Sequence, residues 1–339
     1  MLTFGIIGTS WITHSFVECA HKTAEWDLRA VYSRKEESAR DFAAKYPERA
    51  STIKTYTSLS DLFADPSLTA IYIASPNILH YEQAKQSLEA GKHVILEKPS
   101  CSTTSELTSL FALAKSKSLF LIEAWRHIQE PNFSILKSAI QTKLDGKITG
   151  ASLHFEQFSS RYDKLLAGEL PNIFDLAMGG GALVDLGVYT VAAAIWLFGA
   201  PTNSLYFPVK LSSGADGGGH FILTYDSFTV HLSSSKMYDS SAPSEIYGDN
   251  GTLSVPTITD IQSVSFWDPR KKAREVLGGS EGKGVEPKWN LVDEAREFAR
   301  ILNQSDWEAA GVLERHSVEV LKVTEKVRKD NGLVFPGGK

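Results

Sequence analysis

The sequence predicts an α/β fold: a doubly wound parallel sheet at the amino terminus, followed by an α+β domain with an open, mainly antiparallel sheet. Over about the first 120 residues, short apolar runs alternate with amphipathic stretches, which is typical of parallel strands joined by helices. From about residue 125 onward, strand-like runs follow one another more directly, as in antiparallel sheets. A length of 339 residues also exceeds what one hydrophobic core normally supports. We therefore expect two domains, at 1–123 and 124–339.

In the first domain we expect a strand wherever a short apolar run is bounded by polar or turn residues. These runs are 2–8, 28–33, 70–74, 93–97 and 119–122. Helical spacing of apolar residues predicts helices at 12–22, 36–46, 59–63, 81–90 and 106–116. In the helix at 36–46 the apolar side consists of Ala39, Phe42, Ala43 and Tyr46. Gly91 ends the helix at 81–90, because glycine readily takes the left-handed conformation found after helices.

In the second domain strands predominate. We expect them at 151–158, 204–210, 220–224, 228–233, 244–247, 252–255 and 263–267. Asp249-Asn250-Gly251 is a hairpin turn between two of these strands. Helices are predicted at 133–143, 182–198, 291–302 and 311–329, and the last two, which are amphipathic, are expected to pack back on the first domain. The glycine-rich spans 212–219 and 278–284 indicate surface loops.

The apolar stretch from Ala182 to Ala200 is long enough to cross a membrane. It contains Asp185 and two glycines, lacks a flanking cluster of Lys or Arg, and ends at Pro201. We therefore interpret it as a buried helix and expect no membrane span. The amino terminus lacks the basic residues and the long apolar run of a signal peptide, which favours a cytoplasmic protein.

Composition argues against several other classes of protein. The 35 basic and 40 acidic residues are spread along the chain and give a net charge of −5, which argues against nucleic-acid binding. Cys19 and Cys101 are too few for a disulfide framework or a cysteine metal site, and they fit a reducing compartment. We expect no metal, because six histidines lack metal-ligand spacing: His93, His127, His154, His220, His231 and His316.

The turn between the first strand and the first helix has the character of a phosphate site. A glycine-tipped turn that leads into a helix presents N–H groups and the positive end of the helix dipole to an anion. Of the three glycines in the usual dinucleotide fingerprint, this chain has Gly8, with Ser10 and Thr13 in the other two places. An ordinary strand–helix turn is the alternative. As a coenzyme site, the turn comprises Gly8, Thr9, Ser10, Trp11 and Ile12.

The second predicted strand ends in Ser33 and Arg34, about 20 residues after the turn. NAD-preferring sites usually place an acidic residue there to bind the ribose hydroxyls. A guanidinium instead suits the 2′-phosphate of NADP, which it can bind through two hydrogen bonds. The alternative is that Arg34 and Lys35 only balance Glu36 and its neighbour at the start of a helix. We favour NADP as the coenzyme and keep NAD open.

Glu97-Lys98-Pro99 follows the apolar run 93–96. If that run is a buried strand, Lys98 lies at the carboxyl end of the parallel sheet, where ligands bind in open α/β folds. Desolvation at such a place lowers the pKa of a lysine toward the range useful for proton transfer. By itself, however, the tripeptide more often marks a solvated loop.

A second polar group lies on the apolar helix predicted at 182–198. Asp185 and Tyr189 are four residues apart, so they share one face of that helix. A carboxylate and a phenol on an otherwise apolar helix are costly to bury without partners. The alternative is that Asp185 caps the start of the helix and Tyr189 is a core aromatic with a satisfied hydroxyl.

Taken together, and in their order along the sequence, these motifs resemble those of the Gfo/Idh/MocA (glucose–fructose oxidoreductase/inositol dehydrogenase) family along nearly the whole chain. The matching segments are 5–12, 33–34, 75–77 with His80, 90–99, 123–126 and 179–189. The resemblance implies a Rossmann domain, and a second domain whose exposed sheet face forms a homodimer or homotetramer. Many members have histidine where this chain has Tyr189. A tyrosine there resembles the branch near dimeric dihydrodiol dehydrogenase and xylose dehydrogenase.

The resemblance implies an NAD(P)(H)-dependent oxidoreductase that moves a hydride between nicotinamide and a sugar, polyol or cyclic diol. It makes Lys98 the central catalytic lysine, with Asp185 beside it. In one assignment Tyr189 takes the hydroxyl proton and Lys98 lowers the pKa of the phenol. In the other, Lys98 carries the proton and Tyr189 orients it.

Further residues are implied around these three. On the coenzyme side they are Ser75, Pro76, Asn77, His80 and Glu97, and in the substrate pocket they are Trp125, Arg126, Asn172 and Phe174. Two positions depart from the family pattern. Ser10 replaces a usual glycine, and Asn172 stands where an arginine often precedes the region of Phe174.

Two other functions stay open. One is a glycosidase that uses tightly held NAD for transient oxidation, a chemistry known in this family, and Ser33-Arg34 argues against it. The other is a non-catalytic, dinucleotide-binding regulator. The joint presence of Lys98, Asp185 and Tyr189 argues for an enzyme.

Overall fold

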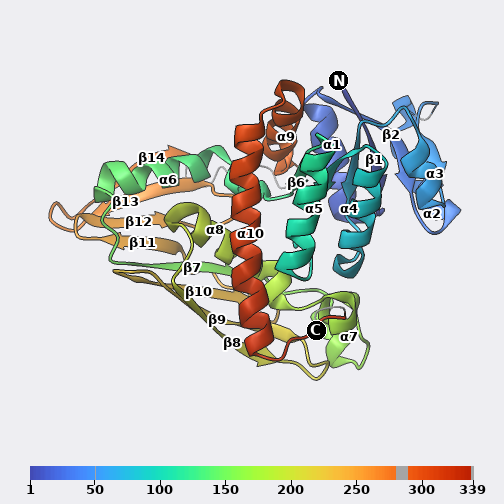
Figure 1. The fold of residues 1–339 in the computed structure, drawn as a ribbon. Coiled ribbons are helices and arrows are strands. Elements are labelled where there is room, and N and C mark those ends of the chain that lie inside the picture. The colour runs from blue at the N-terminus through green and yellow to red at the C-terminus, as the bar shows by residue number, and fades with distance from the viewer. Residues whose placement is uncertain (50, 280–288, 337–339) are drawn as a thin grey trace. The chain divides into compact units, whose positions relative to one another are not determined.

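The computed structural model describes residues 1–49, 51–279 and 289–336, and its chain divides into two units (Figure 1). The first unit comprises Met1–Arg126 and Lys288–Val318, and the second comprises His127–Pro287 and Glu319–Lys339. The long helix α10, Trp307–Asp330, therefore begins in the first unit and ends in the second. Each unit is built on one sheet.

The first unit contains the predicted doubly wound sheet. Its strands are β1 (Leu2–Ile7), β2 (Trp26–Tyr32), β3 (Lys54–Tyr56), β4 (Ala70–Ile73), β5 (His93–Leu96) and β6 (Leu121–Glu123). They are ordered β3-β2-β1-β4-β5-β6, and every neighbouring pair is parallel. The strand order reverses between β1 and β4, so ligands are expected at the carboxyl ends of these two strands. The sequence pattern does not predict β3, because three residues are too few to show a period of two.

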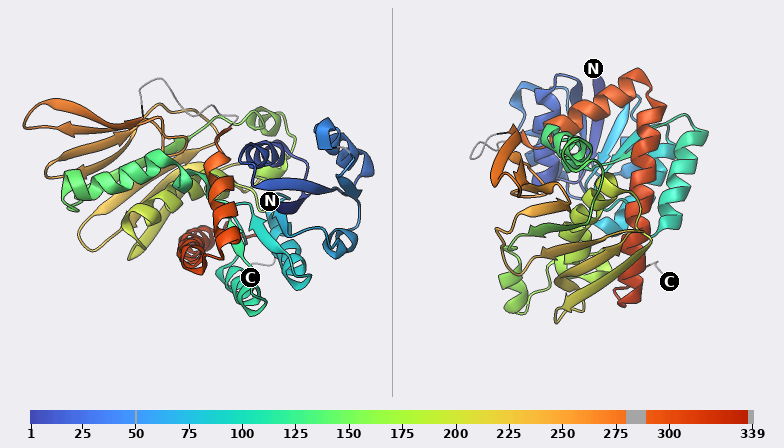
Figure 2. Two further views of the ribbon diagram at one scale, coloured as in Figure 1. Left: turned by 90° about the horizontal axis from the view of Figure 1, so that it is seen from above. Right: turned by 90° about the vertical axis from the view of Figure 1, so that its left-hand side faces the viewer.

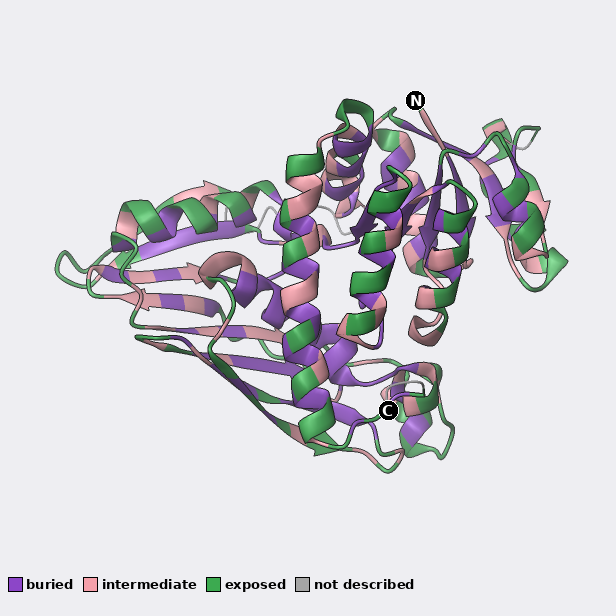
Figure 3. Ribbon diagram, viewed as in Figure 1, coloured by how far each residue is buried: buried purple, intermediate pink, exposed green. Residues whose placement is uncertain are grey.

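The helices of the first unit begin and end close to their predicted positions. They are α1 (Trp11–Lys22), α2 (Glu36–Ala43), α3 (Leu59–Ala64), α4 (His80–Glu89), α5 (Thr104–Ser116) and α9 (Val292–Gln304), with 3₁₀ turns at Pro47–Arg49 and Asn77–Leu79. The predicted apolar side of α2 is buried, and Gly91 follows α4 with a φ of +77°. The start of α5 is held by a reciprocal cap, because Thr103 and Glu106 each accept the other's backbone N–H. Exposed and buried residues alternate along α5, as a helix lying on a sheet requires (Figure 3).

Aromatic packing fills the core of the first unit. Phe4 meets Trp26 edge to face at 5.6 Å, and Phe16 stacks on Tyr72 at 3.9 Å. The indole N–H of Trp26 donates to the carbonyl of Ala295 at 2.8 Å. This hydrogen bond ties α9 to strands that lie near the other end of the chain.

The second unit contains an eight-stranded sheet in the order β14-β13-β12-β11-β7-β10-β9-β8 (Figure 1). Figure 2 shows the ribbon of this sheet in two further views. Its strands are β7 (Gly150–Glu156), β8 (Asn203–Lys210), β9 (Asp216–Thr224), β10 (Thr229–Ser235), β11 (Ser244–Gly248), β12 (Gly251–Val255), β13 (Ser263–Asp268) and β14 (Ala273–Gly279). β7 and β10 run parallel, and the other neighbouring pairs run antiparallel. The predicted hairpin turn joins β11 to β12. The sheet is therefore mainly antiparallel, as the sequence predicts.

Helices pack on this sheet at two places. α6 (Pro131–Leu144) lies on β12, β13 and β14, and α8 (Val188–Phe198) lies on β7 and β10. The shorter elements are α7 (Tyr162–Leu166), 3₁₀ turns at Arg126–Gln129, Asn172–Phe174 and Leu176–Met178, and a π-helical turn, η6, at Leu183–Gly187. The stretch Leu176–Phe198 is long and apolar enough to cross a membrane, but most of it is buried inside the protein. This agrees with the predicted buried helix.

The prediction of surface loops in the glycine-rich spans is confirmed at 212–214, which form an exposed turn, and is wrong for the described residues from 216 onward. β9 begins at Asp216 and buries the glycines that follow it. A Cβ on Gly218 would lie 2.7 Å from the carbonyl of Ser234, and one on Gly219 would lie 2.5 Å from the ring of Tyr206. These glycines therefore allow close packing between strands instead of marking a turn. Gly278 and Gly279 belong to β14, which the sequence did not suggest, and 280–284 lies outside the described residues.

Candidate functional site

Four of the predicted coenzyme segments follow strands of the parallel sheet in the first unit. The turn at 8–12 follows β1, Ser33-Arg34 follows β2, Ser75-Pro76-Asn77 follows β4, and Glu97-Lys98 follows β5. Because these strands are parallel neighbours, their carboxyl ends lie along one edge of the sheet. The topology therefore gathers these segments on both sides of the point where the strand order reverses.

Gly8 is required by its surroundings. Its φ is +105°, and a Cβ at this position would lie 2.5 Å from the carbonyl of Ala74 at the end of β4. Ser10 precedes α1 in an extended conformation, and its hydroxyl makes no capping hydrogen bond to the helix. The Ser10 hydroxyl lies 3.4 Å from that of Thr13. The turn thus keeps the close backbone approach of a phosphate-binding turn, and Ser10 does not cap the amides at the start of α1.

Arg34 is exposed at the end of β2. Among the described residues it has no hydrogen-bond or ion-pair partner, and Glu36 pairs with Arg40 on α2 instead. The backbone next to it is held, since the N–H of Ser33 donates to Tyr56 of β3 at 3.1 Å. The alternative in which Arg34 balances Glu36 is therefore not observed, and the guanidinium is available to an anionic ligand.

The segment that carries Lys98 is anchored residue by residue. Glu97 accepts hydrogen bonds from the Tyr72 hydroxyl at 2.6 Å and from the Lys98 amide at 3.2 Å. Pro99, which follows a cis peptide bond, has its carbonyl 2.9 Å from His80 Nδ1. The amide of Ser100 donates to Glu123 at 2.7 Å. Lys98 thus stands on a backbone with little freedom to move.

His80 lies between two of the predicted coenzyme segments. It is buried, and its Nδ1 and Nε2 lie 2.9 Å from the carbonyls of Pro99 and Ser75. Burial lowers the pKa of His80, and the nearby charge of Lys98 acts in the same direction. His80 therefore braces the segments after β4 and β5 against each other. Each ring nitrogen lies within hydrogen-bonding distance of a backbone carbonyl, and a neutral ring can donate to one of the two at a time.

Two buried carboxyl groups, Glu294 and Glu123, lie close to the segment that carries Lys98. Glu294 acts electrostatically on Glu97, and Glu123 accepts a hydrogen bond from the Ser100 amide. Glu294 on α9 is 1% exposed, and neither of its side-chain oxygens has a hydrogen-bond partner among the described residues. Burial and the nearby Glu97 raise the pKa of Glu294, while the charge of Arg126 opposes this. Glu294 is not among the residues predicted from the sequence. The available signal was its place on the apolar side of the predicted helix, beside Ala295 and four residues before Phe298.

Glu123, at the end of β6, makes stability depend on pH. Burial raises its pKa to about 7, against hydrogen bonds from Ser317 and Ser100 that favour the ionised form. Because the unfolded glutamate has a pKa of about 4.3, the native state holds more protons than the unfolded state above that pH, and stability falls as the pH rises toward 7. We expect Glu123→Gln, which keeps an acceptor for the Ser100 amide, to be more stable than wild type by about 3 kcal/mol at pH 8 and nearly equal to it at pH 4.

Urea unfolding of both proteins between pH 4 and pH 8 measures this difference. Glu89→Gln, at an exposed position on α4, is the control and should track wild type throughout. A difference between Glu123→Gln and wild type that stays constant over this range would contradict the assignment.

Two residues expected in the substrate pocket belong to the core instead. Trp125 is 1% exposed, and its indole N–H donates to the Ser317 hydroxyl at 2.9 Å. Phe174 is fully buried beside Tyr162. Both are large side chains, and burying them removes a large apolar surface from water. Arg126 is half-buried with its charge near Glu97, and Asn172 is exposed.

In the second unit, the π-helical turn η6 carries Asp185 and leads into α8, where Tyr189 is the second residue. Such turns are rare and are often found at functional sites. Gly187 lets the turn approach the sheet, because a Cβ there would lie 3.0 Å from the Ser234 hydroxyl. Tyr189 is mostly buried between His127 and Phe155, whose rings lie 5.1 and 5.4 Å away.

Asp185 forms an ion pair that was not predicted from the sequence. Lys236, directly after β10, donates to one of its carboxylate oxygens. A lysine next to a serine-rich strand end gives no sequence signal of this contact. The N-cap of α8 is Gly187 and not Asp185, and the Asp185 carboxylate pairs with a buried cation of the second unit.

The structure divides the three predicted catalytic residues between the units, with Lys98 in the first and Asp185 and Tyr189 in the second. Within the described residues there is no group of three or more His, Cys, Asp or Glu side chains arranged to hold a metal ion.

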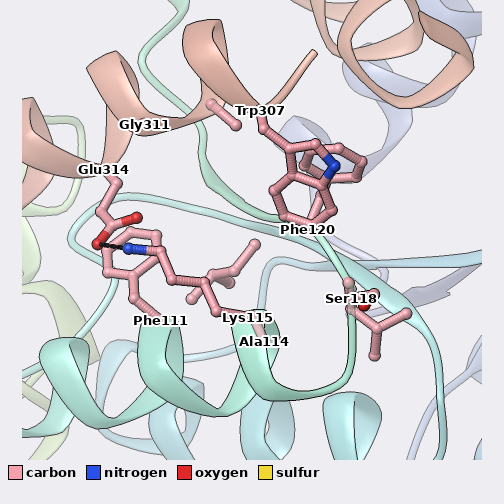
Figure 4. Close-up of a pocket in the computed structure, with 11 residues that line it drawn as sticks. Phe111, Ala114, Lys115, Ser118, Phe120, Trp307, Gly311 and Glu314 are labelled. Carbon is pink, nitrogen blue, oxygen red and sulfur yellow. Dashed lines mark hydrogen bonds and ion pairs between the residues drawn. The ribbon is translucent and has the colours of Figure 1, made fainter. Parts of the chain in front are cut away.

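A cavity of about 500 Å³ lies elsewhere in the first unit (Figure 4). Trp307 and Phe120 stack at 4.0 Å on one side of it, and Lys115 pairs with Glu314 at 2.7 Å on another. Its lining includes Leu121 at the amino end of β6. The coenzyme segments follow the carboxyl ends of the strands, so this cavity is not the coenzyme site.

Comparison with known proteins agrees with this architecture. Residues 2–124 match the family described as "Oxidoreductase family, NAD-binding Rossmann fold", and residues 133–254 match the "GFO/IDH/MocA C-terminal domain". The chain is 37% identical to scyllo-inositol 2-dehydrogenase (NADP(+)) of Bacillus subtilis (strain 168), over 99% of both proteins. It is 27% identical to trans-1,2-dihydrobenzene-1,2-diol dehydrogenase of Mus musculus, over 100% of this chain and 99% of that protein.

A solved structure shows the same fold. It is a 3-ketoreductase from Actinomadura kijaniata in complex with NADP and TDP-benzene, with a TM-score of 0.81, 21% identity and coverage of 97% of each chain. Two family matches that together span most of the chain, and a full-length relative well above 30% identity, leave one assignment: the chain belongs to the GFO/IDH/MocA family and is an oxidoreductase with an NAD-binding Rossmann domain.

Proposed function

We propose that the protein transfers a hydride between NADP(H) and a hydroxyl-bearing carbon of a cyclic polyol, sugar or cyclic diol. The observation that carries this proposal is the anchored Lys98 at the carboxyl end of β5, on the same sheet edge as the coenzyme turn. The substrate class is supported by full-length relatives that are named as dehydrogenases of scyllo-inositol and of a benzene dihydrodiol.

The residues at the sheet edge suit an NADP molecule. The backbone cradle at Gly8, which a Cβ would fill, fits the pyrophosphate, and Arg34 with Ser33 fits the 2′-phosphate. Pro76 and Asn77 after β4 would support the nicotinamide side. The bound coenzyme supplies the hydride acceptor or donor, and the chain supplies the proton transfer.

The residues that would act on the substrate hydroxyl groups are Lys98, Tyr189 and Asp185. In the assignment we favour, the Tyr189 phenol takes the proton from the substrate hydroxyl while the charge of Lys98 favours the phenolate. Asp185 would accept a hydrogen bond from a neighbouring substrate hydroxyl. The converse assignment, with Lys98 as proton carrier, differs in the result expected for Tyr189→Phe.

Reduction of NADP⁺ across aldoses, polyols including scyllo-inositol, and trans-dihydrodiols tests the proposal, with NAD⁺ in parallel. We expect turnover with at least one of these substrates and a preference for NADP⁺. No turnover with any of them, together with glycoside cleavage by protein that co-purifies with NAD, would replace the proposal with a glycosidase function.

Arg34→Ala is expected to weaken NADPH binding by about 10- to 100-fold and to leave NADH binding nearly unchanged, because it removes a charge-assisted contact to the 2′-phosphate alone. Titration of coenzyme fluorescence measures both constants. Lys45→Ala, an exposed lysine just after α2, is the matched control for the loss of a surface cation. Equal weakening of both coenzymes would contradict the assigned role of Arg34.

We further propose a cytoplasmic homodimer or homotetramer that associates through the face of the second sheet turned away from α6 and α8. The register puts several exposed apolar side chains on this face: Leu205, Phe207, Val209, Trp267 and Val276. Exposed apolar patches of this kind mark protein interfaces. Light scattering is expected to give a mass of two or four chains, and Phe207→Arg is expected to reduce it to one chain without unfolding. A wild-type mass of one chain would contradict the proposal.

A further inference from the structure

We propose that Lys236 is a positioning residue of the active site, whose buried ammonium holds the Asp185 carboxylate ionised and in one orientation. This inference rests on the proposed function, in which Asp185 faces the substrate. It adds a residue of this chain that lies 51 positions from Asp185 and outside every motif of the sequence analysis.

Lys236 is held in place from both sides of its backbone. Its N–H donates to the Gly217 carbonyl on β9 at 2.8 Å, and its own carbonyl accepts from the Ser159 N–H at 2.9 Å. Its side chain is 6% exposed and donates to Asp185 Oδ2. Since a long, flexible lysine side chain loses much freedom on burial, such a fixed ammonium requires a strong partner.

The acidic groups around Lys236 divide into two roles. Asp216 on β9 is buried and within electrostatic reach of Lys236, but its Oδ2 accepts the Leu183 amide at 2.6 Å and the Tyr206 hydroxyl at 2.7 Å. Asp216 therefore fixes the start of the π-helical turn. Asp185, on that turn, is the ion-pair partner of the ammonium.

The side chains of Lys236 and Asp185 differ in how far they are exposed to solvent. The Asp185 side chain is 31% exposed, whereas that of Lys236 is 6% exposed. The ammonium thus approaches the carboxylate from its buried side. A buried cation stabilises an ionised carboxylate, and an ionised carboxylate accepts hydrogen bonds without donating them. Asp185 is accordingly set to accept from a substrate hydroxyl, which favours substrates with a hydroxyl beside the reacting carbon.

The test compares Lys236→Met and Lys236→Arg with wild type on the substrate that the panel identifies. In the second unit Asp216 lies within electrostatic reach of Lys236, and Tyr189, whose ring packs against His127, is four residues from Asp185 in the chain. Both variants keep these groups, so a changed pH profile reports on Asp185. For Lys236→Met we expect kcat/KM at pH 7 to fall about 10- to 100-fold and the acidic limb of its pH profile to move up by about one to three units.

The conservative variant and two controls complete the design. Lys236→Arg keeps the charge and should restore the pH limb and most of the activity. Lys147→Met, at an exposed position of the same unit, should resemble wild type. NADPH binding should be unchanged in every variant. If Lys236→Met proves unstable, Lys236→Met with Asp185→Asn should recover part of the lost Tm, because it removes both charges of the pair.

The outcomes separate the two proposals. A wild-type protein that turns over no substrate of the panel overturns the proposed function, and this inference with it. An active wild type overturns the inference alone if Lys236→Met keeps the wild-type pH limb, since a purely structural role would lower activity equally at all pH values.

Discussion

Replacing Lys98 with methionine is expected to lower kcat by about 10²- to 10⁴-fold while NADPH binding survives. Methionine keeps the length of the side chain but has neither a charge nor a transferable proton. The backbone around position 98 is anchored through Glu97, Pro99 and Ser100, so the substitution is expected to change chemistry and to leave the loop in place. Steady-state kinetics with the best panel substrate, together with a fluorescence titration of NADPH, measures the two effects separately.

Lys85→Met provides the control for this variant. Lys85 lies on α4 in the same unit, and its side chain has no hydrogen-bond partner among the described residues. Its replacement should leave kcat within about twofold of wild type, as expected for substitutions away from special features. Turnover by Lys98→Met at the wild-type rate would remove Lys98 from the mechanism and with it the basis of the proposed function.

Tyr189→Phe is expected to lower kcat by about 10²- to 10³-fold, because it deletes the hydroxyl that we assign to proton transfer and keeps the ring. The ring packs against His127 and Phe155, and phenylalanine preserves those contacts. The measurement is the pH dependence of kcat, in which the limb that belongs to the proton carrier should disappear in this variant. If Lys98 carries the proton instead, Tyr189→Phe retains the wild-type limb and loses little activity.

Tyr225→Phe is a matched control, because Tyr225 and Tyr189 are both 8% exposed and lie in the same unit. The Tyr225 hydroxyl donates to the Gly199 carbonyl at 3.1 Å, so its removal costs about 1 kcal/mol of stability and should not affect kcat. Equal losses of kcat in the two variants would mean that Tyr189 acts through stability, which would contradict its catalytic assignment.

Much of the first unit follows from its local pattern. Apolar runs and helical spacing depend on residues close together in the chain, and each strand carries its own signal. Once the strands are known to be parallel, the rule for open α/β sheets brings the residues after β1, β2, β4 and β5 to one edge. For this reason Gly8, Arg34 and Lys98 could be named before any coordinates. Short or irregular strands were not predicted from the sequence. β3 has three residues, and β14 carries glycines that resemble a loop.

The local sequence pattern could not predict which polar and aromatic side chains are buried or which groups they contact. His80, Trp125 and Phe174 have the residue types of a ligand site, yet the structure uses them as a brace between two loops and as core packing. The glycines of β9 look like a turn but serve close contact between strands. In each case the deciding neighbour lies far away in the sequence, as Ser317 does for Trp125.

By itself, the sequence determined the two sheets, the family and the order of the coenzyme segments, because these rest on local periodicity and on motifs of contiguous residues. The tertiary structure alone decided which polar groups are buried and what they meet. It placed Lys236 against Asp185 and Glu294 behind the Lys98 segment. The physical reason is that the free energy of a buried charge depends on its partners in space, and folding brings those partners together from distant parts of the chain.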